Sequence, residues 1–231
     1  MALLGALSTE AQTYQEPNRF ELALNGGLCR TSIPQESMYQ GQTSYWRPYA
    51  ALKALYTIQE HFQVGFEVNG SRWETTDNNV PVTGLYGKPL GTDTVRYIFA
   101  RPALTFLASA NAIIPVFKNY RYNNVANFHI GAGLGPVVTL NDGATGTKEY
   151  SSSDENNRMS YLNSYSFKPG SGWAFGFQAG YTHYIKEHIG FGVEYSPRFY
   201  RINTGDADLA GRNQGFTLWT HPLSISVRYR W

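Results

Sequence analysis

Apolar and polar residues alternate along most of this chain, and the alternation is clearest at its end. Leu223, Ile225, Val227, Tyr229 and Trp231 occupy every second position, with Ser or Arg between them. Side chains of a β-strand point alternately to opposite faces, so the pattern predicts a strand with one apolar face. A strand that ends in a bare aromatic face needs an apolar environment to cover it.

The same alternation predicts seven earlier strands. In one of them Phe62, Val64, Phe66 and Val68 share a face, and Glu67 lies on the other. We expect the four apolar residues to face lipid and Glu67 to face the interior of a barrel. The predicted strands are long enough to cross a membrane when tilted. They cover about 20–29, 45–58, 62–71, 94–107, 125–138, 172–184, 189–201 and 214–231.

The connections between these strands alternate between short and long. Only 59–61 and 185–188 separate two of the strand pairs, whereas long polar stretches precede every second strand. This is typical of an up-and-down barrel. We therefore predict an all-β fold, an eight-stranded antiparallel up-and-down transmembrane β-barrel with short periplasmic turns and long outer loops. The long loops are 30–44, 73–93, 139–171 and 202–213, and segment 108–124 fits either a short helix or a longer hairpin.

The polar face of the predicted strands carries charges of both signs. An eight-stranded barrel is narrow enough for side chains to fill its lumen. Ionised groups are costly to bury unless they are paired, so we predict an interlocked network with Glu67 and Glu194 each beside an arginine or lysine. Gly131 and Gly133 share that face and suit tight packing better than a nucleotide-binding loop, which needs a following helix. The predicted network is Lys53, Glu67, Arg101, Glu194, Arg198 and Arg228.

Aromatic residues collect near the ends of the predicted strands. Amphipathic rings prefer the two membrane–water interfaces, so two aromatic girdles are expected of a membrane barrel. A soluble lipocalin-like barrel needs none. The predicted interface aromatics are Trp46, Trp73, Trp173 and Trp219 at the loop side and Tyr229 and Trp231 at the turn side.

Composition narrows the class of protein further. Of the 231 residues 16% are charged and 15% are aromatic, and the net charge is only +2, so nucleic acid is not an expected partner. The single Cys29 excludes an internal disulfide. Residues 1–13 contain a short apolar stretch and a small-residue site, which indicate the remnant of a signal peptide and leave 14–231 as one barrel domain.

On these patterns, and on its ending from Arg228 to Trp231, the chain resembles the small eight-stranded outer-membrane barrels of the OmpA/OmpX type. In pattern it is most similar to the outer membrane protein beta-barrel families of Bacteroidetes. The resemblance covers about 20–231. It implies a place in the cell outer membrane of a Gram-negative bacterium, in contact with outer-membrane lipid, but it implies no chemistry.

No arrangement of residues in the sequence predicts catalysis, a metal site or a cofactor. No pair of histidines has metal-ligand spacing with carboxylates on the same strand face. Small outer-membrane barrels include a lipid A deacylase, which needs a His and a Ser two positions apart on the lipid-facing surface. His221 and Ser224 are three apart, so their side chains should point to opposite faces. We therefore expect no enzyme, no cofactor and no small-molecule substrate.

The expected function is that of a non-enzymatic outer-membrane barrel, a structural or accessory subunit of a larger envelope complex with a protein partner in the outer membrane. Two alternatives stay open: a surface binding or adhesion protein acting through the 139–171 loop, and a lipid A modifying enzyme. Tyr and Arg dominate protein-recognition sites, and the loop is rich in aromatic and charged residues. Its candidate partner-binding residues are Arg158, Tyr161, Tyr165 and Phe167.

Overall fold

The fold comes from a computed structural model, which describes residues 19–32, 42–59, 61–83, 89–118, 124–140, 148–151, 170–185, 187–207 and 213–231. Within these ranges all the regular elements are β-strands, and no helix is long and apolar enough to cross a membrane. The strands are β1 (Phe20–Ser32), β2 (Gln42–Ser44), β3 (Trp46–Gln59), β4 (Phe62–Thr83), β5 (Pro89–Lys118), β6 (Asn124–Thr139), β7 (Lys148–Ser151), β8 (Gly170–Tyr184), β9 (Ile189–Tyr195), β10 (Arg198–Ala207) and β11 (Asn213–Arg230).

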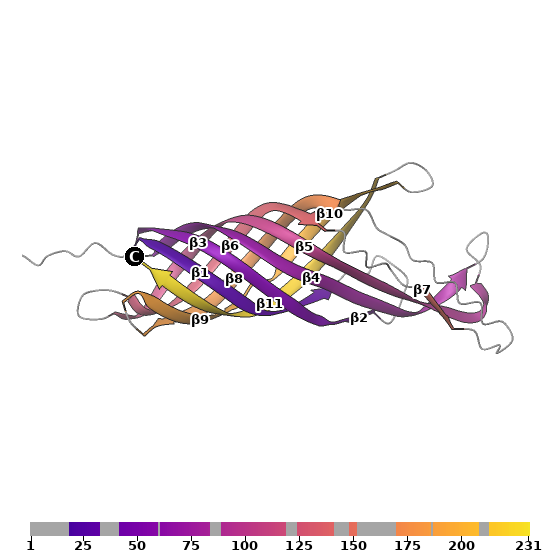
Figure 1. The fold of residues 1–231 in the computed structure, drawn as a ribbon, viewed down its shortest axis with the longest axis horizontal. Coiled ribbons are helices and arrows are strands. Elements are labelled where there is room, and N and C mark those ends of the chain that lie inside the picture. Colours follow the sequence, from indigo (N-terminus) through magenta and orange to yellow (C-terminus); the bar gives the residue numbers. More distant parts are fainter. Residues whose placement is uncertain are drawn as a thin grey trace, which may run out of the picture.

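The longer strands form one closed antiparallel wall (Figure 1). Around the wall the order is β1, β3, β4, β5, β6 and β8, then β9 and β10 end to end, then β11, which pairs back with β1. Ser196 and Pro197 separate β9 from β10, where proline cannot donate a backbone hydrogen bond to the ladder. With β9 and β10 taken as one, the wall has eight strands, so the predicted barrel is confirmed.

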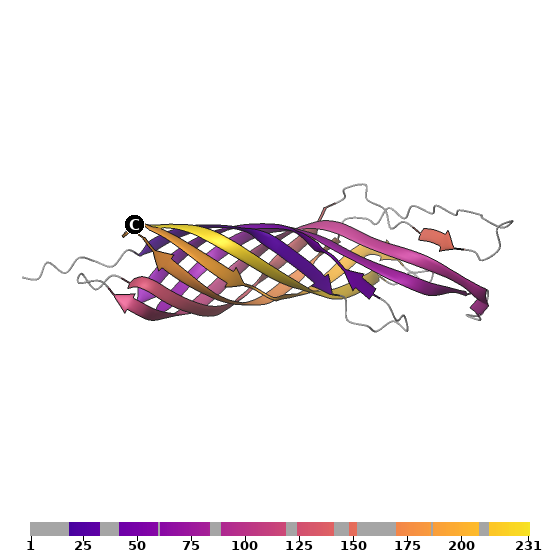
Figure 2. The ribbon, with the colours of Figure 1, turned by 90° about the horizontal axis from the view of Figure 1, so that it is seen from below.

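The strands of the wall are staggered. Following paired residues once around the wall from Phe20 leads back to β1 at Arg30, a shift of ten residues (30 − 20 = 10). Such a stagger tilts the strands relative to the barrel axis, as Figure 2 shows. Eight strands with this tilt enclose a bore that side chains can fill.

One hairpin continues beyond the wall. β4 and β5 remain paired past Trp73 and Arg101 as far as Thr83 and Pro89, and they project from the barrel (Figures 1 and 2). β2 pairs with β4 here, and β7 pairs with β5. We call β2, β7 and these outer parts of β4 and β5 the arm. The loop predicted over 73–93 is wrong for the paired residues. Outside the membrane no lipid imposes the alternation on which the prediction depended.

β5 also runs further than predicted at its other end. It continues to Lys118 and pairs with β6 as far as Asn124. β4 begins opposite Ala112, so the last part of the β5–β6 hairpin extends past β4. Of the two structures that the sequence allowed for 108–124, the described residues adopt the longer hairpin.

The wall has an apolar outer face and a largely polar inner face. On β4, Phe62 and Phe66 are 41% and 49% exposed, whereas Glu67, directly after Phe66, is 2% exposed. The predicted orientation of this strand is therefore confirmed. Large apolar side chains are exposed in the same way on every strand of the wall, among them Leu24, Leu52, Ile114, Ile130, Phe177, Val193 and Ile225. Water cannot cover so large an apolar belt, so the wall lies in lipid.

Candidate functional site

The centre of the lumen is a buried lysine that contacts carboxylates from two different strands. Lys53 Nζ, from β3, lies 2.5 Å from Glu194 Oε1 of β9 and 3.3 Å from Glu67 Oε2 of β4. It also donates a hydrogen bond to Gln178 Oε1 of β8 at 2.7 Å. All three charged side chains are at most 3% exposed, so these contacts lie out of water.

Toward the loop end, this lysine cluster continues into an arginine. Arg198 Nη2 lies 2.5 Å from Glu67 Oε1, and it donates to the Tyr49 hydroxyl at 2.8 Å. The Tyr49 hydroxyl in turn donates to Glu67 Oε1 at 3.2 Å. Glu67 therefore has two cations and one phenol around it.

Toward the turn end, the cluster continues through Arg228. Its Nη1 lies 2.8 Å from Glu21 Oε1, and its Nη2 lies 3.5 Å from Glu194 Oε2. His129 Nε2 is 3.3 Å from the same Glu194 oxygen. The Tyr184 hydroxyl donates to Glu21, so the second carboxylate oxygen of Glu21 is also satisfied.

The positive and negative charges of this cluster are equal in number. We call the three cations Lys53, Arg198 and Arg228 and the three carboxylates Glu21, Glu67 and Glu194 the charge network. Each carboxylate contacts at least one of the cations. A balanced and hydrogen-bonded set is the form in which charges can be buried at tolerable cost.

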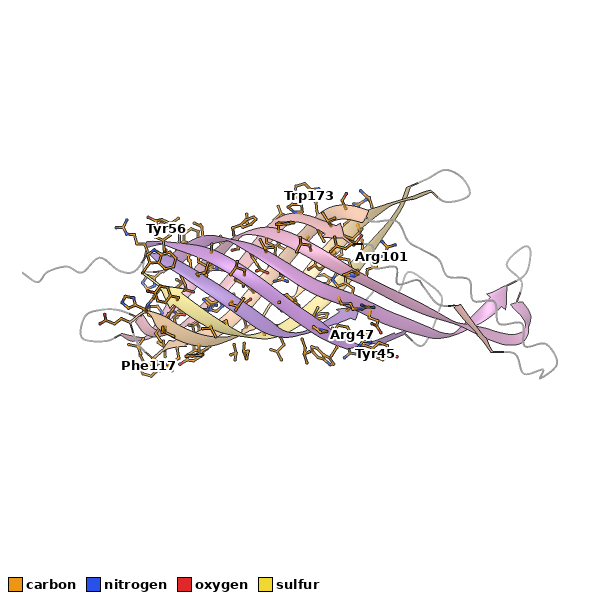
Figure 3. All side chains as sticks on the ribbon, viewed as in Figure 1. Tyr45, Arg47, Tyr56, Arg101, Phe117 and Trp173 are labelled. Atoms are coloured by element: carbon orange, nitrogen blue, oxygen red, sulfur yellow. The ribbon has the colours of Figure 1, made fainter. Side chains whose placement is uncertain are left out.

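One member of the charge network, one of its neighbours and one predicted member need separate comment. The sequence missed Glu21 and the neighbouring His129, although alternation with outward Phe20 and Leu22 already placed Glu21 inside. Arg101 was predicted as a member. It is buried and lies opposite Trp73 in the β4–β5 ladder, at the loop end of the wall (Figure 3).

The loop end of the lumen is filled by an apolar cluster. The Trp73 ring lies 4.7 Å from the Tyr200 ring, and its Nε1 donates to Ser71 Oγ at 3.0 Å. Trp73 was predicted as an interface aromatic, which is wrong: it is fully buried, because it shares the inward parity of Glu67 and Ser71. The members of the apolar cluster are Trp73, Ala103, Leu107, Val137, Ala174, Tyr200, Ile202 and Leu218.

Little free volume remains between the two parts of the lumen. A cavity of about 10 Å³ lies between Glu67, Ser109 and Gln178, which is room for about one water. At Gly131 the backbone of the wall lies close to a lumen side chain: a Cβ at this position would lie 2.0 Å from Asn111 Oδ1. Larger residues at that position would not fit beside the filled lumen.

The outer face carries aromatic rings at both ends. Trp46 and Trp173 are exposed at the loop end, and Trp219 is partly exposed there. Tyr229 and Trp231 are exposed at the turn end. Figure 3 shows the separation along the barrel: Trp173 lies toward the arm, and Tyr56 and Phe117 lie at the opposite end.

A polar cluster interrupts the apolar outer face near the loop end. The Tyr195 hydroxyl is 2.9 Å from His221 Nδ1, and Ser32 Oγ is 3.4 Å from His221 Nε2. The serine comes from β1 and the histidine from β11, so sequence spacing could not bring them together. Ser224 points into the lumen, away from His221, as the parity predicted.

The candidate partner-binding residues cannot be placed. Arg158, Tyr161, Tyr165 and Phe167 lie outside the described residues. Among the side chains that are described, no group of three or more His, Cys, Asp or Glu could hold a metal ion.

Comparison with known proteins shows the fold and no family. No protein-family model matches the chain, and no curated protein sequence matches it. Among solved structures, Neisserial surface protein A is 11% identical, with 92% of this chain and 97% of that chain covered and a TM-score of 0.50. Ail, the attachment invasion locus protein of Yersinia pestis, solved with the heparin analogue sucrose octasulfate, is 10% identical, with 92% and 99% covered and a TM-score of 0.45.

A protease is also among the similar structures. The outer membrane protease OmpT of Escherichia coli is 7% identical, with 94% of this chain and 98% of that chain covered and a TM-score of 0.45. These similarities are too distant to carry over an activity. The first of them, together with the closed wall and its apolar outer face, shows that the chain is an outer-membrane β-barrel.

Proposed function

We propose that the protein is a sealed barrel that conducts no solutes and serves as a non-catalytic structural or accessory subunit of a larger envelope complex. The filled lumen carries this proposal. The charge network occupies its middle and turn end, and the apolar cluster occupies its loop end. Opening a path would require separating buried ion pairs, which costs several kcal/mol for each uncompensated charge.

Conductance measurements test the sealed lumen. The purified barrel, reconstituted into planar lipid bilayers, should give no stepwise openings at moderate voltage, in contrast to a general porin inserted under the same conditions. The double variant Trp73→Gly with Tyr200→Gly removes the two large rings of the apolar cluster. It should give stepwise openings if that cluster blocks the lumen. Reproducible openings of the unaltered barrel would overturn the proposal.

A sealed barrel must act through its rim or its outer wall. We propose that a protein partner binds the 139–171 loop, through Arg158, Tyr161, Tyr165 and Phe167. Support comes from β7, a part of that loop which pairs with β5 in the arm and so holds the loop beside a strand platform outside the wall. Aromatic and arginine side chains are the usual anchors of such interfaces.

Loop deletion tests the partner. Removing 145–168 should leave a folded, heat-modifiable barrel but abolish co-purification with the partner. Removing only 152–157, a polar stretch without the candidate aromatics, is the matched control and should leave co-purification intact. If both deletion variants co-purified with the partner equally well, the interface would lie on the outer wall rather than on the loop. If the larger deletion instead abolished attachment of cells to a surface, the adhesion alternative would replace the subunit role.

A second candidate function rests on the outer-wall cluster. His221 contacts a hydroxyl group at each of its ring nitrogens. In this arrangement Ser32 could be the nucleophile, His221 the base and Tyr195 the group that orients the base. In ester hydrolysis the Ser32 hydroxyl oxygen would bond to the ester carbon while its proton passes to His221 Nε2 and then to the departing alcohol. Water would then release the fatty acid and restore the serine. Fatty acid released from lipid A by the purified barrel, and not by Ser32→Ala, would establish this candidate.

We also propose that the chain is related to the barrel families of Bacteroidetes. The pattern of strands and loops supports this relationship, which adds no residue to either candidate site.

A further inference from the structure

Three arginines stand on the lipid-facing side of the wall near its loop end. Arg30 of β1, Arg72 of β4 and Arg201 of β10 are exposed and share the outward parity of their strands. On β1, for instance, Arg30 follows the exposed Leu24 and Leu28 in the alternation. We call Arg30, Arg72 and Arg201 the arginine collar.

The collar lies at the height of the loop-end aromatic residues. Arg30 is directly opposite Trp46 in the β1–β3 ladder, and Arg201 is directly opposite Trp173 in the β8–β10 ladder. Both tryptophans are exposed on the outer face. Tryptophan on the outer face of a membrane barrel marks the level at which lipid headgroups begin. The collar guanidinium groups therefore lie where the headgroups of the outer leaflet lie.

The described outward side chains of this region carry more positive than negative charge. Among the described side chains of outward parity at the loop end, the cations are the three collar arginines and the carboxylate is Glu74. Arg47 already holds Glu74 through two of its nitrogens, and Arg72 Nε lies 3.6 Å from the same carboxylate. Three arginines against one carboxylate leave an excess of positive charge among these described side chains, in contrast to the balanced lumen.

Arg30 contacts a side chain of the neighbouring strand β2. Its Nε donates to Ser44 Oγ at 2.8 Å, which fixes the plane of the guanidinium group. The two Nη nitrogens make no hydrogen bond with another described residue, and the side chain is exposed. His221 is directly opposite Arg30 in the β1–β11 ladder, which places the polar pair His221 and Ser32 beside it.

We infer that the arginine collar binds the phosphate groups of outer-leaflet lipids, with Arg30 and Arg201 as the main contacts. A guanidinium group presents paired N–H donors that match two oxygens of one phosphate, and phosphate supplies the negative charge that the region lacks. The exposed tryptophans beside these arginines pack against the upper part of the acyl chains. This site is independent of the proposed partner loop.

Binding of a phosphorylated lipid to the purified barrel tests the inference. The probe is lipid A carrying both of its phosphates, and the comparison is lipid A from which the phosphates have been removed. The amount bound to the barrel in detergent micelles is measured by native mass spectrometry. Arg30→Gln and Arg201→Gln should each weaken binding by about fivefold, and the double variant by the product of the two.

An arginine at the other end of the barrel provides the matched control. Arg19 is exposed at the turn end, before β1, and Arg19→Gln removes the same charge by the same substitution. It should leave lipid A binding unchanged. All four variants should keep the heat-modifiable shift of the folded barrel, because each substituted side chain is exposed.

Three outcomes would overturn the inference. One is equal binding of lipid A with and without its phosphates. Another is an equal effect of Arg19→Gln and Arg30→Gln. The third is full competition by inorganic phosphate at the concentration of the lipid, which would identify free phosphate rather than a lipid as the ligand.

Discussion

Toward the turn end the lumen holds ionised side chains in mutual contact, whereas toward the loop end it holds Trp73, Tyr200, Leu218 and other apolar residues. Both halves are filled, but they depend on different physics. Each ion of the charge network is stable only while particular partners stay within a few ångströms of it. The apolar cluster needs only that its volume be filled. The turn half should therefore be sensitive to the loss of single atoms, and the loop half to the loss of volume.

The largest expected effect is at the central lysine of the network. Lys53→Met removes the ammonium group between Glu67 and Glu194 while keeping a side chain of similar length. We expect the free energy of unfolding to fall by about 3–5 kcal/mol, because two buried carboxylates lose a partner. Urea titration of the barrel in phospholipid vesicles, followed by tryptophan fluorescence, measures the change.

A double variant separates the loss of charge from the loss of packing. Lys53→Met combined with Glu194→Gln removes one charge of each sign and should recover part of the lost stability. A cost below about 1 kcal/mol for Lys53→Met alone would contradict the view that the network is tightly coupled.

A smaller effect is expected in the apolar cluster. Leu218→Ala should lower the free energy of unfolding by about 2–4 kcal/mol, because the buried site loses apolar contacts and gains a cavity. Leu24→Ala, on the lipid-facing side of β1, is the matched control. Lipid fills the space that it leaves, so this variant loses apolar contact without gaining a cavity, and its cost should be smaller than that of Leu218→Ala. Similar costs for the two variants would show that the loop half of the lumen is not closely packed.

The smallest effect is expected at an ion pair outside the lumen. Arg47 Nε donates to Glu74 Oε2 at 2.7 Å, but the arginine side chain is 35% exposed. Arg47→Gln should cost less than about 1 kcal/mol, and 0.5 M NaCl should reduce even that difference. The same salt should leave the cost of Lys53→Met unchanged, because the network lies out of water. A salt dependence at Lys53 would show that water enters the lumen.

The wall was predictable from sequence because two environments impose the same period on it. Lipid outside and a packed lumen inside both require every second residue to have one character, as Phe66 and Glu67 illustrate. The arm extends beyond the lipid-facing wall, so no lipid imposes that period on residues such as Thr75 and Thr76, and its part within 73–93 was taken for a loop. Trp73 was predicted as an interface aromatic because it lies near the end of a predicted strand, although its parity is that of the inward residues.

The contents of the lumen were predictable, but most of the contacts were not. Alternation places Lys53 and Glu194 inside the barrel, yet these residues are 141 positions apart in the chain. Whether they meet depends on the stagger of all the strands between them. That stagger is set by the bulges and turn lengths of the whole wall, and a single sequence does not specify those. The contact between Ser32 and His221 on the outer face escaped prediction for the same reason.

The pairing of β1 with β11 has a consequence for how the chain is made. Glu21 meets Arg230, so the first strand of the wall finds one of its two neighbours only when nearly the whole sequence exists. Until then both it and β10 carry rows of unpaired N–H and C=O groups, which lipid cannot satisfy. A chain that lacks β11 therefore forms an open sheet, which cannot remain in the bilayer. Closure of the wall has to wait until β11 has been made, and a cell must keep the unfinished chain from aggregating in the meantime.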